Sequence, residues 1–271
     1  MREMSHPFFA RRHPLVFGHR GASGERPENT LISFELALAQ GADVLETDVH
    51  LTRDGEVVVL HDADVARTTD GVGDAAALDW REVAALDAGA RFVAADGSTP
   101  FRERGVRIPR LDDLFARFPD AAFNIELKRD DARLVAAVIA LIRRHAREQR
   151  TLLAAERDET MRLLRTALAE TRCGAAIGAS VGEVLGFVRA AVERGAPPAG
   201  PMALQIPAEF LGRPLVTSEL LAFAHAHGVH VHVWTINAPA EMERLLALGA
   251  DGVMSDFPGL LRRVVDARHD L

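Results

Sequence analysis

Residues 18–30 read Gly18-His19-Arg20-Gly21-Ala22-Ser23-Gly24-Glu25-Arg26-Pro27-Glu28-Asn29-Thr30 and directly follow the apolar residues 15–17. An apolar run that opens into a glycine-rich turn and then into a helix start is typical of a buried strand and its loop. His19 and Arg20 stand where the strand ends, so a group that transfers protons lies beside a fixed cation, a pairing suited to phosphate chemistry. The alternative is a surface turn with two incidental polar residues.

Strand-like runs recur along the whole chain and are mostly separated by helical patterns. We place the strands at residues 15–19, 43–49, 57–61, 122–128, 151–156, 202–206, 229–236 and 252–255. Helical patterns occupy residues 31–40, 134–145, 160–169, 181–193, 217–227 and 239–248. Eight strands alternating with helices predict a parallel α/β fold. The 271 residues favour a closed TIM (β/α)8 barrel, which typically needs about 250.

One segment, residues 63–109, is too long to be a structureless loop. It contains a helical piece around Trp80 and a stretch rich in glycine and charge at residues 97–105. We therefore expect a single domain covering residues 1–271, with a small insertion subdomain after the third strand, over one end of the barrel. Between residues 151 and 214 the strand boundaries are the least defined.

Composition limits the possible partners and locations. A net charge of −7, from 32 basic and 39 acidic residues, argues against a nucleic-acid binder, which would carry a basic surface. The N-terminus is polar, and the longest apolar run, residues 134–142, falls far short of the ~20 residues that span a bilayer. We expect no signal peptide, no stable membrane insertion and a cytoplasmic location. The sequence makes no prediction of the oligomeric state.

Polar residues two apart share one face of a strand, and such pairs occur near the ends of two predicted strands. Glu46 and Asp48 form one pair, and Glu126 and Lys128 form the other. In a parallel barrel the C-terminal ends of the strands surround one mouth, where active sites lie. Three carboxylates meeting there would repel one another, so we interpret Glu46, Asp48 and Glu126 as ligands of a hard divalent metal, Mg²⁺ or Ca²⁺. The alternative is a buried ionic network with Arg20, Arg53 or Lys128.

Lys128 is the only lysine of the chain, whose other basic residues are arginines. A compact ammonium differs chemically from a planar guanidinium. Lys128 is therefore a candidate for the chemistry of the site.

Two histidines end predicted strands at the same mouth. His19 closes the first strand and His61 the third, and histidine can serve as general acid or general base near neutral pH. We predict that they form the acid/base pair. Asp62 follows His61 directly and should point to the other face of an extended strand, so we do not expect it to orient His61.

A third group of candidates lies on residues 229–236. His230 and His232 resemble the paired histidines of an amidohydrolase two-metal site, but in that family the pair ends the first strand. We therefore interpret both as residues that line the barrel. Trp234 lies on the same face, nearer the strand's end. It is a candidate wall of the substrate pocket, and the alternative is a buried core aromatic.

These residues resemble the glycerophosphodiester phosphodiesterase family. The resemblance rests on motifs in the same order over nearly the whole chain: Gly18-His19-Arg20-Gly21, Pro27-Glu28-Asn29-Thr30, residues 41–49, Thr52-Arg53-Asp54-Gly55, His61-Asp62, Arg67-Thr68-Thr69, Ile108-Pro109-Arg110-Leu111, residues 125–128, Trp234-Thr235-Ile236-Asn237, residues 249–253 and Ser255-Asp256. Arg53, Arg110 and Ser255 depart from the residues usual in the family, and none is a proposed catalytic position.

The resemblance implies a TIM barrel with an insertion after the third strand and a divalent metal held by Glu46, Asp48 and Glu126. It implies hydrolysis of glycerophosphodiesters to glycerol 3-phosphate and an alcohol, with Arg20 and Lys128 at the phosphate. We assign His61 as the acid and His19 as the base. The resemblance leaves open the alcohol head group, the metal, and whether water or the glycerol hydroxyl attacks first. The alternatives are lysophospholipase D or sphingomyelinase D activity on lipid phosphodiesters, and a barrel that binds phosphodiesters without catalysis.

Overall fold

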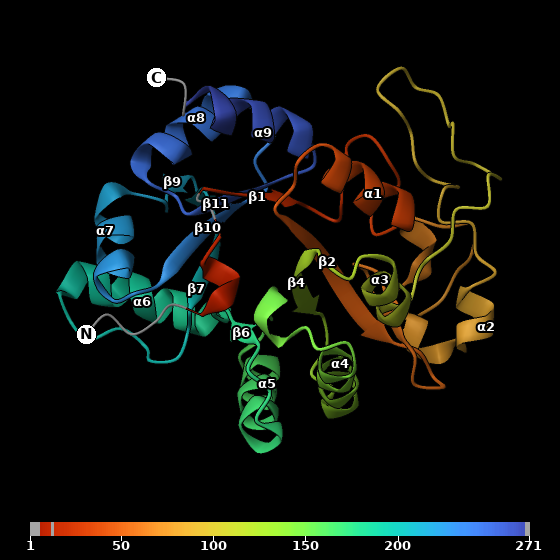
Figure 1. Cartoon of the computed structure of the whole chain (residues 1–271), viewed down its shortest axis with the longest axis horizontal. Helices are drawn as coiled ribbons and strands as arrows, with labels where there is room; N and C mark the ends of the chain where they lie inside the picture. Colours follow the sequence, from red (N-terminus) through yellow and green to blue (C-terminus); the bar gives the residue numbers. More distant parts are fainter. Residues whose placement is uncertain (1–5, 12–13, 269–271) are drawn as a thin grey trace.

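The computed structural model describes residues 6–11 and 14–268. Residues 1–5 and 12–13, on which the expectation of no signal peptide partly rests, lie outside the described residues. Parallel strands form a barrel with helices around it (Figure 1). The barrel strands are β1 (Leu15–Gly18), β2 (Val44–Leu51), β4 (Ala122–Leu127), β5 (Thr151–Ala154), β6 (Ala176–Ile177), β7 (Ala203–Pro207), β10 (His230–Trp234) and β11 (Gly252–Ser255).

The neighbouring strands run in the order β6-β5-β4-β2-β1-β11-β10-β7. A parallel bridge between Gly178 and Ala203 joins the two ends of this order. The fold is therefore the predicted TIM barrel.

The strand at residues 57–61 was wrongly predicted as a barrel strand. β3 (Val57–Val59) runs antiparallel to β2, with Val49 opposite Val59. Only residues 52–56 connect the two, and a parallel partner would need a crossover of a dozen or more residues. Gly55, at φ 93°, permits this tight reversal. The eighth barrel strand is instead the two-residue β6, which lies in the part of the chain where the sequence pattern is weakest.

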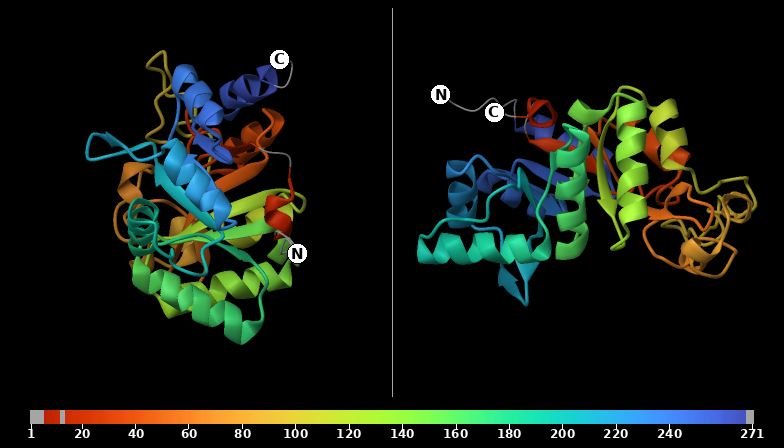
Figure 2. Two further views of the ribbon diagram at one scale, coloured as in Figure 1. Left: turned by 90° about the vertical axis from the view of Figure 1, so that its left-hand side faces the viewer. Right: turned by 90° about the horizontal axis from the view of Figure 1, so that it is seen from below.

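The six helices predicted from the sequence pattern are present, within a few residues at their ends, and the helices at residues 111–117 and 258–267 were not predicted. They pack on the outside of the barrel (Figure 2). In chain order they are α1 (Leu31–Ala39), α3 (Leu111–Arg117), α4 (Ala132–Arg144), α5 (Asp158–Thr171), α6 (Val181–Glu193), α7 (Ser218–Ala226), α8 (Pro239–Leu248) and α9 (Pro258–Ala267). No helix among the described residues is long and apolar enough to cross a bilayer.

A short 3₁₀ helix, η1 (Pro7–Phe9), closes the N-terminal end of the barrel. Phe8 and Phe9 are buried in a cluster with residues from the starts of the strands. Phe9 stacks on His230 with ring centroids 4.3 Å apart, and the buried His232 lies 4.7 Å from the ring of Phe17. Both histidines line the barrel, as predicted, and the opposite end remains the mouth.

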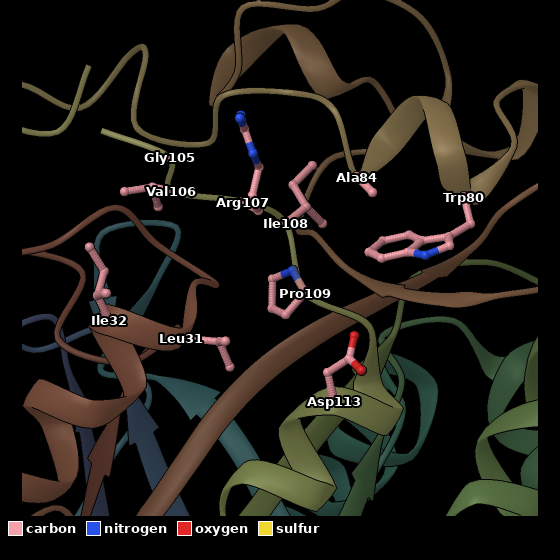
Figure 3. Close-up of a pocket in the computed structure, with 10 residues that line it drawn as sticks. All are labelled: Leu31, Ile32, Trp80, Ala84, Gly105, Val106, Arg107, Ile108, Pro109 and Asp113. Carbon is pink, nitrogen blue, oxygen red and sulfur yellow. The ribbon is translucent and has the colours of Figure 1, made fainter. Parts of the chain in front are cut away.

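Residues 63–109 lie at the mouth side of the barrel. They contain two 3₁₀ helices, η2 (Val65–Arg67) and η3 (Ala75–Ala77), and the single-turn helix α2 (Trp80–Val83). Apolar residues of this segment form a separate core with the end of β3: Val58, Leu60, Val65, Ala75, Val83, Ala88, Val106 and Ile108. A pocket of about 390 Å³ lies between α1 and this segment, with Leu31, Trp80 and Pro109 in its lining (Figure 3).

A second projection at the mouth is the hairpin of β8 (Glu209–Phe210) and β9 (Arg213–Pro214), which follows β7. In the right-hand view of Figure 2, it extends from the end of the barrel opposite to η1. The mouth is thus flanked by the segment 63–109 on one side and by this hairpin on the other.

Candidate active site

Three carboxylates from two adjacent strands converge at the mouth. Glu46 and Asp48 are two residues apart on β2, and Glu126 of β4 is the register partner of Asp48. One oxygen of each lies within 4.8 Å of the others. Glu46 and Asp48 are only 4% and 1% exposed. The structure therefore brings together the three residues predicted to bind a metal, and such a set of oxygens fits a hard divalent cation.

Burial and mutual repulsion set the charge state of this carboxylate cluster. Burial and the nearby charge of Asp48 raise the pKa of Glu46 to about 7. Burial also raises the pKa of Glu126. At Asp48 burial acts in the same direction, but the cations Lys128 and Arg20 outweigh it and lower its pKa. A divalent cation beside these groups would favour the ionised form of each.

Arg20 and Lys128 lie against the same carboxylates. The backbone N–H of Arg20 donates to Oε2 of Glu46 at 2.9 Å, and its Nε lies 3.3 Å from Oδ2 of Asp48. Nζ of Lys128 lies 3.1 Å from Oδ1 of Asp48 and 3.0 Å from Oε2 of Glu126. Both predicted phosphate-binding cations therefore lie at the carboxylate cluster.

The ionic-network alternative is realised only in part, because Arg53 lies elsewhere. Its guanidinium is 2.6 Å from Asp79 and 3.2 Å from Glu82 on the surface. When all three carboxylates are ionised, the two cations leave an excess of negative charge, which a divalent metal would complement.

The turn that presents His19 and Arg20 requires glycine on both sides. A side chain at Gly18 would approach the carbonyl oxygen of Gly21 to 2.8 Å. Gly21 has φ 87°, and a side chain there would lie 2.3 Å from the hydroxyl of Ser33. Such close contacts, and the left-handed backbone, exclude other residues without a local shift. The glycines thereby fix the backbone that presents both candidate side chains.

His19 is oriented by a carboxylate that the sequence analysis did not single out. Its Nδ1 lies 2.7 Å from Oδ1 of Asp256, in the loop after β11. Asp256 also accepts hydrogen bonds from Ser23 (2.8 Å) and Asn237 (2.7 Å). Burial lowers the pKa of His19, but Asp256 and the charge of Glu46 outweigh this and raise it overall. Asp256 itself has its pKa lowered to about 2, because these hydrogen bonds prevail over its burial.

The side chain of His61 is hydrogen-bonded to that of its neighbour Asp62, which was wrongly excluded as the residue that orients it. Nδ1 of His61 lies 2.6 Å from Oδ1 of Asp62. The exclusion assumed an extended strand, but β3 ends at Val59 and the backbone bends at residues 61–63. The alternation of faces therefore does not apply to this pair. Despite its partial burial, Asp62 has its pKa lowered to about 2 by hydrogen bonds from Arg67 and His61.

Residues 27–30 hold two of the candidate site residues in place through hydrogen bonds. Nδ2 of the buried Asn29 donates to Oδ2 of Asp48 at 3.1 Å, and its Oδ1 accepts from Thr47 at 2.8 Å. Glu28 accepts a hydrogen bond from Nη1 of Arg20 at 3.0 Å. The signal for Asn29, Glu28 and Asp256 was already present in the family motifs, but sequence spacing does not show which atoms they contact.

Trp234 lies at the mouth end of β10 and is 42% exposed. The alternative of a buried core aromatic is therefore wrong. Its partner in the register with β7 is Pro207, after which the β8–β9 hairpin begins.

Comparisons with known proteins agree with this geometry. The model of the Glycerophosphoryl diester phosphodiesterase family matches residues 19–260. A probable glycerophosphodiester phosphodiesterase 2 of Mycobacterium tuberculosis is 32% identical over 94% of this chain and 91% of its own length. The mouse lysophospholipase D GDPD3 is 31% identical over 93% of this chain and 82% of its own.

Among solved structures, an Oleispira antarctica phosphodiesterase in complex with the product sn-glycerol-3-phosphate superimposes with a TM-score of 0.77. The two chains are 26% identical, and the match covers 94% of this chain and 97% of the other. This chain therefore belongs to the glycerophosphoryl diester phosphodiesterase family and is a phosphoric diester hydrolase.

Proposed function

We propose that this enzyme hydrolyses small glycerophosphodiesters to glycerol 3-phosphate and an alcohol, using a divalent metal and the His19/His61 pair. The observation that carries the proposal is that three carboxylates, two of them buried, meet at one mouth with two histidines that are each hydrogen-bonded to a carboxylate. In this proposal the whole chain acts as one barrel domain with an insertion at residues 63–109. The Oleispira antarctica phosphodiesterase was solved in complex with the product sn-glycerol-3-phosphate, which supports the choice of product.

The phosphodiester would be held by the two cations at the carboxylate cluster. Arg20 presents a planar fork of donors to the phosphate oxygens, and Lys128 presents a compact ammonium. Their charges would stabilise the negative charge that develops on these oxygens in the transition state. Loss of either should therefore lower turnover as well as affinity.

The histidines would transfer the protons of the reaction. His19, with Nδ1 bonded to Asp256, takes the proton of the attacking hydroxyl on its other nitrogen, Nε2. The attacking oxygen forms a bond to phosphorus, and the bond from phosphorus to the alcohol oxygen breaks. His61, with Nδ1 bonded to Asp62, gives a proton to that departing oxygen. The same roles serve an attacking water and an attacking glycerol hydroxyl, which would first close a cyclic phosphate.

Glu46, Asp48 and Glu126 would hold the metal, and their oxygens favour Mg²⁺ or Ca²⁺. Such an ion supplies polarisation of a phosphoryl oxygen. The chain's own part is to hold the three carboxylates close together, while the cations Lys128 and Arg20 favour the ionised form of Asp48.

The experiment that tests this proposal is an activity panel. Purified protein is freed of metal, restored with Mg²⁺ or Ca²⁺, and given several glycerophosphodiesters, with glycerol 3-phosphate measured as the product. Release of glycerol 3-phosphate that needs the added metal supports the proposal. Binding of the diesters without turnover would favour the barrel that binds but does not catalyse.

A second candidate function is lysophospholipase D activity on single-chain lipids. Relatives named lysophospholipase D cover more than nine-tenths of this chain, and the mouth carries exposed apolar side chains. Phe210 and Leu211 of the hairpin are 53% and 86% exposed, beside the strand that bears Trp234. Against it, residues 97–105 on the other side of the mouth are mostly polar or charged, so we place the small diesters first.

Comparing glycerophosphocholine with lysophosphatidylcholine separates the two functions. Faster turnover of the lipid would make the second candidate the correct one. The double variant Phe210→Ser/Leu211→Ser should then lose lipid turnover and keep turnover of glycerophosphocholine. Equal rates of the variant and wild type on the lipid would remove the hairpin from lipid binding.

A further inference from the structure

The inserted segment reaches the candidate active site through Arg67, the last residue of η2. Its guanidinium contacts two carboxylates at once. Nη1 and Nη2 donate to the two oxygens of Glu28 at 2.9 and 2.7 Å, and Nε donates to Oδ2 of Asp62. Neither carboxylate belongs to the proposed metal ligands.

Each of these carboxylates holds a different functional group. Glu28 accepts from Nη1 of Arg20, whose Nε faces Asp48. The guanidinium of Arg20 is thus fixed from two sides, and Arg67 fixes the carboxylate on one of them. The contact with Glu28 therefore connects Arg67 to Arg20, the cation proposed to bind the phosphate.

The contact with Asp62 connects Arg67 to His61, the proposed general acid. Asp62 binds Nδ1 of His61 with one oxygen and Arg67 with the other. Because one oxygen of Asp62 accepts from Nε of Arg67, the carboxylate cannot rotate without breaking a charged hydrogen bond. The ring of His61 is thereby kept with Nδ1 toward Asp62 and Nε2 available to the substrate.

We propose that Arg67 is a positioning residue of the reaction, which aligns His61 through Asp62 and Arg20 through Glu28. The inference rests on the proposed function, and it assigns the inserted segment a part in catalysis. Glu28 follows β1 and Asp62 follows β3, so the two carboxylates lie far apart in the sequence. The guanidinium of Arg67 contacts both of them.

We expect these contacts to position His61 and Arg20 rather than to stabilise the fold. The side chain of Arg67 is 45% exposed, and ion pairs of exposed groups stabilise folded proteins little. Arg53 provides a matched comparison: its side chain is 56% exposed and also contacts two carboxylates, Asp79 and Glu82, away from the site. Arg67→Gln and Arg53→Gln remove the same charge and similar contacts, and only the first touches the functional groups.

The experiment compares wild type, Arg67→Gln, Arg67→Lys and Arg53→Gln in full-length protein with metal. Steady-state rates are measured on glycerophosphocholine and on an analogue that has p-nitrophenol in place of choline. A departing p-nitrophenolate needs little protonation, so a defect that acts through His61 should be smaller on the analogue. Thermal unfolding is measured on every variant, and ¹⁵N spectra of labelled histidine report on the His61 ring, assigned with His61→Gln.

For Arg67→Gln we expect kcat on glycerophosphocholine to fall by about tenfold to a hundredfold, a part of what a general acid contributes. The fall in kcat should shrink on the p-nitrophenyl analogue, while a rise in KM persists on both because Arg20 is loosened. Arg67→Lys should remain defective, since an ammonium cannot replace the fork. Arg53→Gln should match wild type, and all unfolding temperatures should stay close together. In the spectra, Arg67→Gln should lose the signature of a proton fixed on Nδ1 of His61.

The proposal is overturned if Arg67→Gln matches Arg53→Gln in kcat and KM. It is also overturned if the kcat defect is the same on both substrates and accompanies a large loss of stability. If wild type hydrolyses no diester, the proposed function fails, and the histidine spectrum alone decides the positioning. An altered His61 signal in Arg67→Gln then supports it, and an unchanged signal overturns it.

Discussion

The imidazole of His19 and the carboxylate of Asp256 form a hydrogen bond, with Nδ1 and Oδ1 2.7 Å apart. The two residues lie at opposite ends of the chain and meet because Gly18 of β1 pairs with Ser255 of β11. Ser23 and Asn237 hold the carboxylate in place. Closing the barrel between its first and last strands therefore also completes the proposed general base.

Replacing this carboxylate should change both the rate and its pH dependence. Asp256→Asn keeps the shape, but its amide can donate a hydrogen bond to Nδ1. This leaves the hydrogen of the neutral ring on Nε2, where a base needs a lone pair. Loss of about 10²-fold or more in kcat is expected by analogy with other histidine bases held by aspartate. Asp256 also contributes to the raised pKa of His19, and a base works in its unprotonated form. The acidic limb of kcat/KM should therefore move to lower pH in the variant.

The measurement is a pH profile of kcat/KM for wild type and Asp256→Asn at one fixed metal concentration. Asp266→Asn on α9 serves as a control, because Asp266 is exposed and lies next to Arg262 rather than a histidine. An acidic limb that stays in place, or moves to higher pH, would separate Asp256 from the titration of His19.

The two histidines should each be required for turnover. His19→Ala and His61→Ala are each expected to lower kcat by about 10²-fold or more, the contribution typical of a general acid or base. Single-turnover measurements on glycerophosphocholine test this. Full activity in either variant would remove that histidine from the mechanism, and unchanged unfolding temperatures would show that the fold is intact.

Metal affinity should depend on pH through Glu46. The pKa of this carboxyl is about 7 without a metal, so a proton competes with the ion below that pH. The apparent Kd for Mg²⁺ or Ca²⁺ should tighten as pH rises through about 7, because a carboxylate ligand must lose its proton to bind. Titration calorimetry at several pH values measures this.

Glu46→Gln is the matched variant for that titration. It should bind the ion more weakly and lose the pH dependence near 7. Glu35→Gln, at the exposed ion pair between Glu35 of α1 and Arg117 of α3, should behave like wild type. Wild-type affinity in Glu46→Gln would exclude Glu46 as a ligand.

Arg147 should stabilise the fold from within the core. Its side chain is buried between the rings of Phe115 and Phe123, and it donates to the carbonyl oxygens of Phe118 and Pro119 at 3.1 and 2.8 Å. Arg147→Met leaves the oxygen of Phe118 without this donor, whereas Pro119 keeps a hydrogen bond from Arg150. The variant should lower the free energy of unfolding by about 1–3 kcal/mol for each group left unsatisfied. Denaturant unfolding measures the loss. The more exposed Arg150→Gln should change stability far less, and equal effects would refute this account.

Much of the fold could be predicted from the sequence, because long amphipathic helices and apolar strands have a clear hydrophobic periodicity. The exceptions have local causes. β6 is only two residues long, too short to produce a pattern, and β3 runs antiparallel because the link from β2 is short. The helix η1 was not predicted. Its Phe8 and Phe9 pack against the starts of strands that come together only in the folded barrel.

The candidate site was predictable where side chains sit on regular strands. The alternation of faces placed Glu46 with Asp48, and the strand ends placed His19 near them. The alternation of faces failed for Asp62, because the backbone bends after β3. It also gave no sign of Arg67, whose proposed role depends on contacts with Asp62 and Glu28. Such contacts arise from tertiary packing, which local sequence patterns do not encode.

The most direct test of the account is the release of glycerol 3-phosphate from glycerophosphocholine by metal-free protein before and after addition of Mg²⁺ or Ca²⁺. We expect no release without metal, release after either ion or one of them is added, and loss of that release in His19→Ala. Undiminished release after thorough chelation, or none with either ion, would contradict the account.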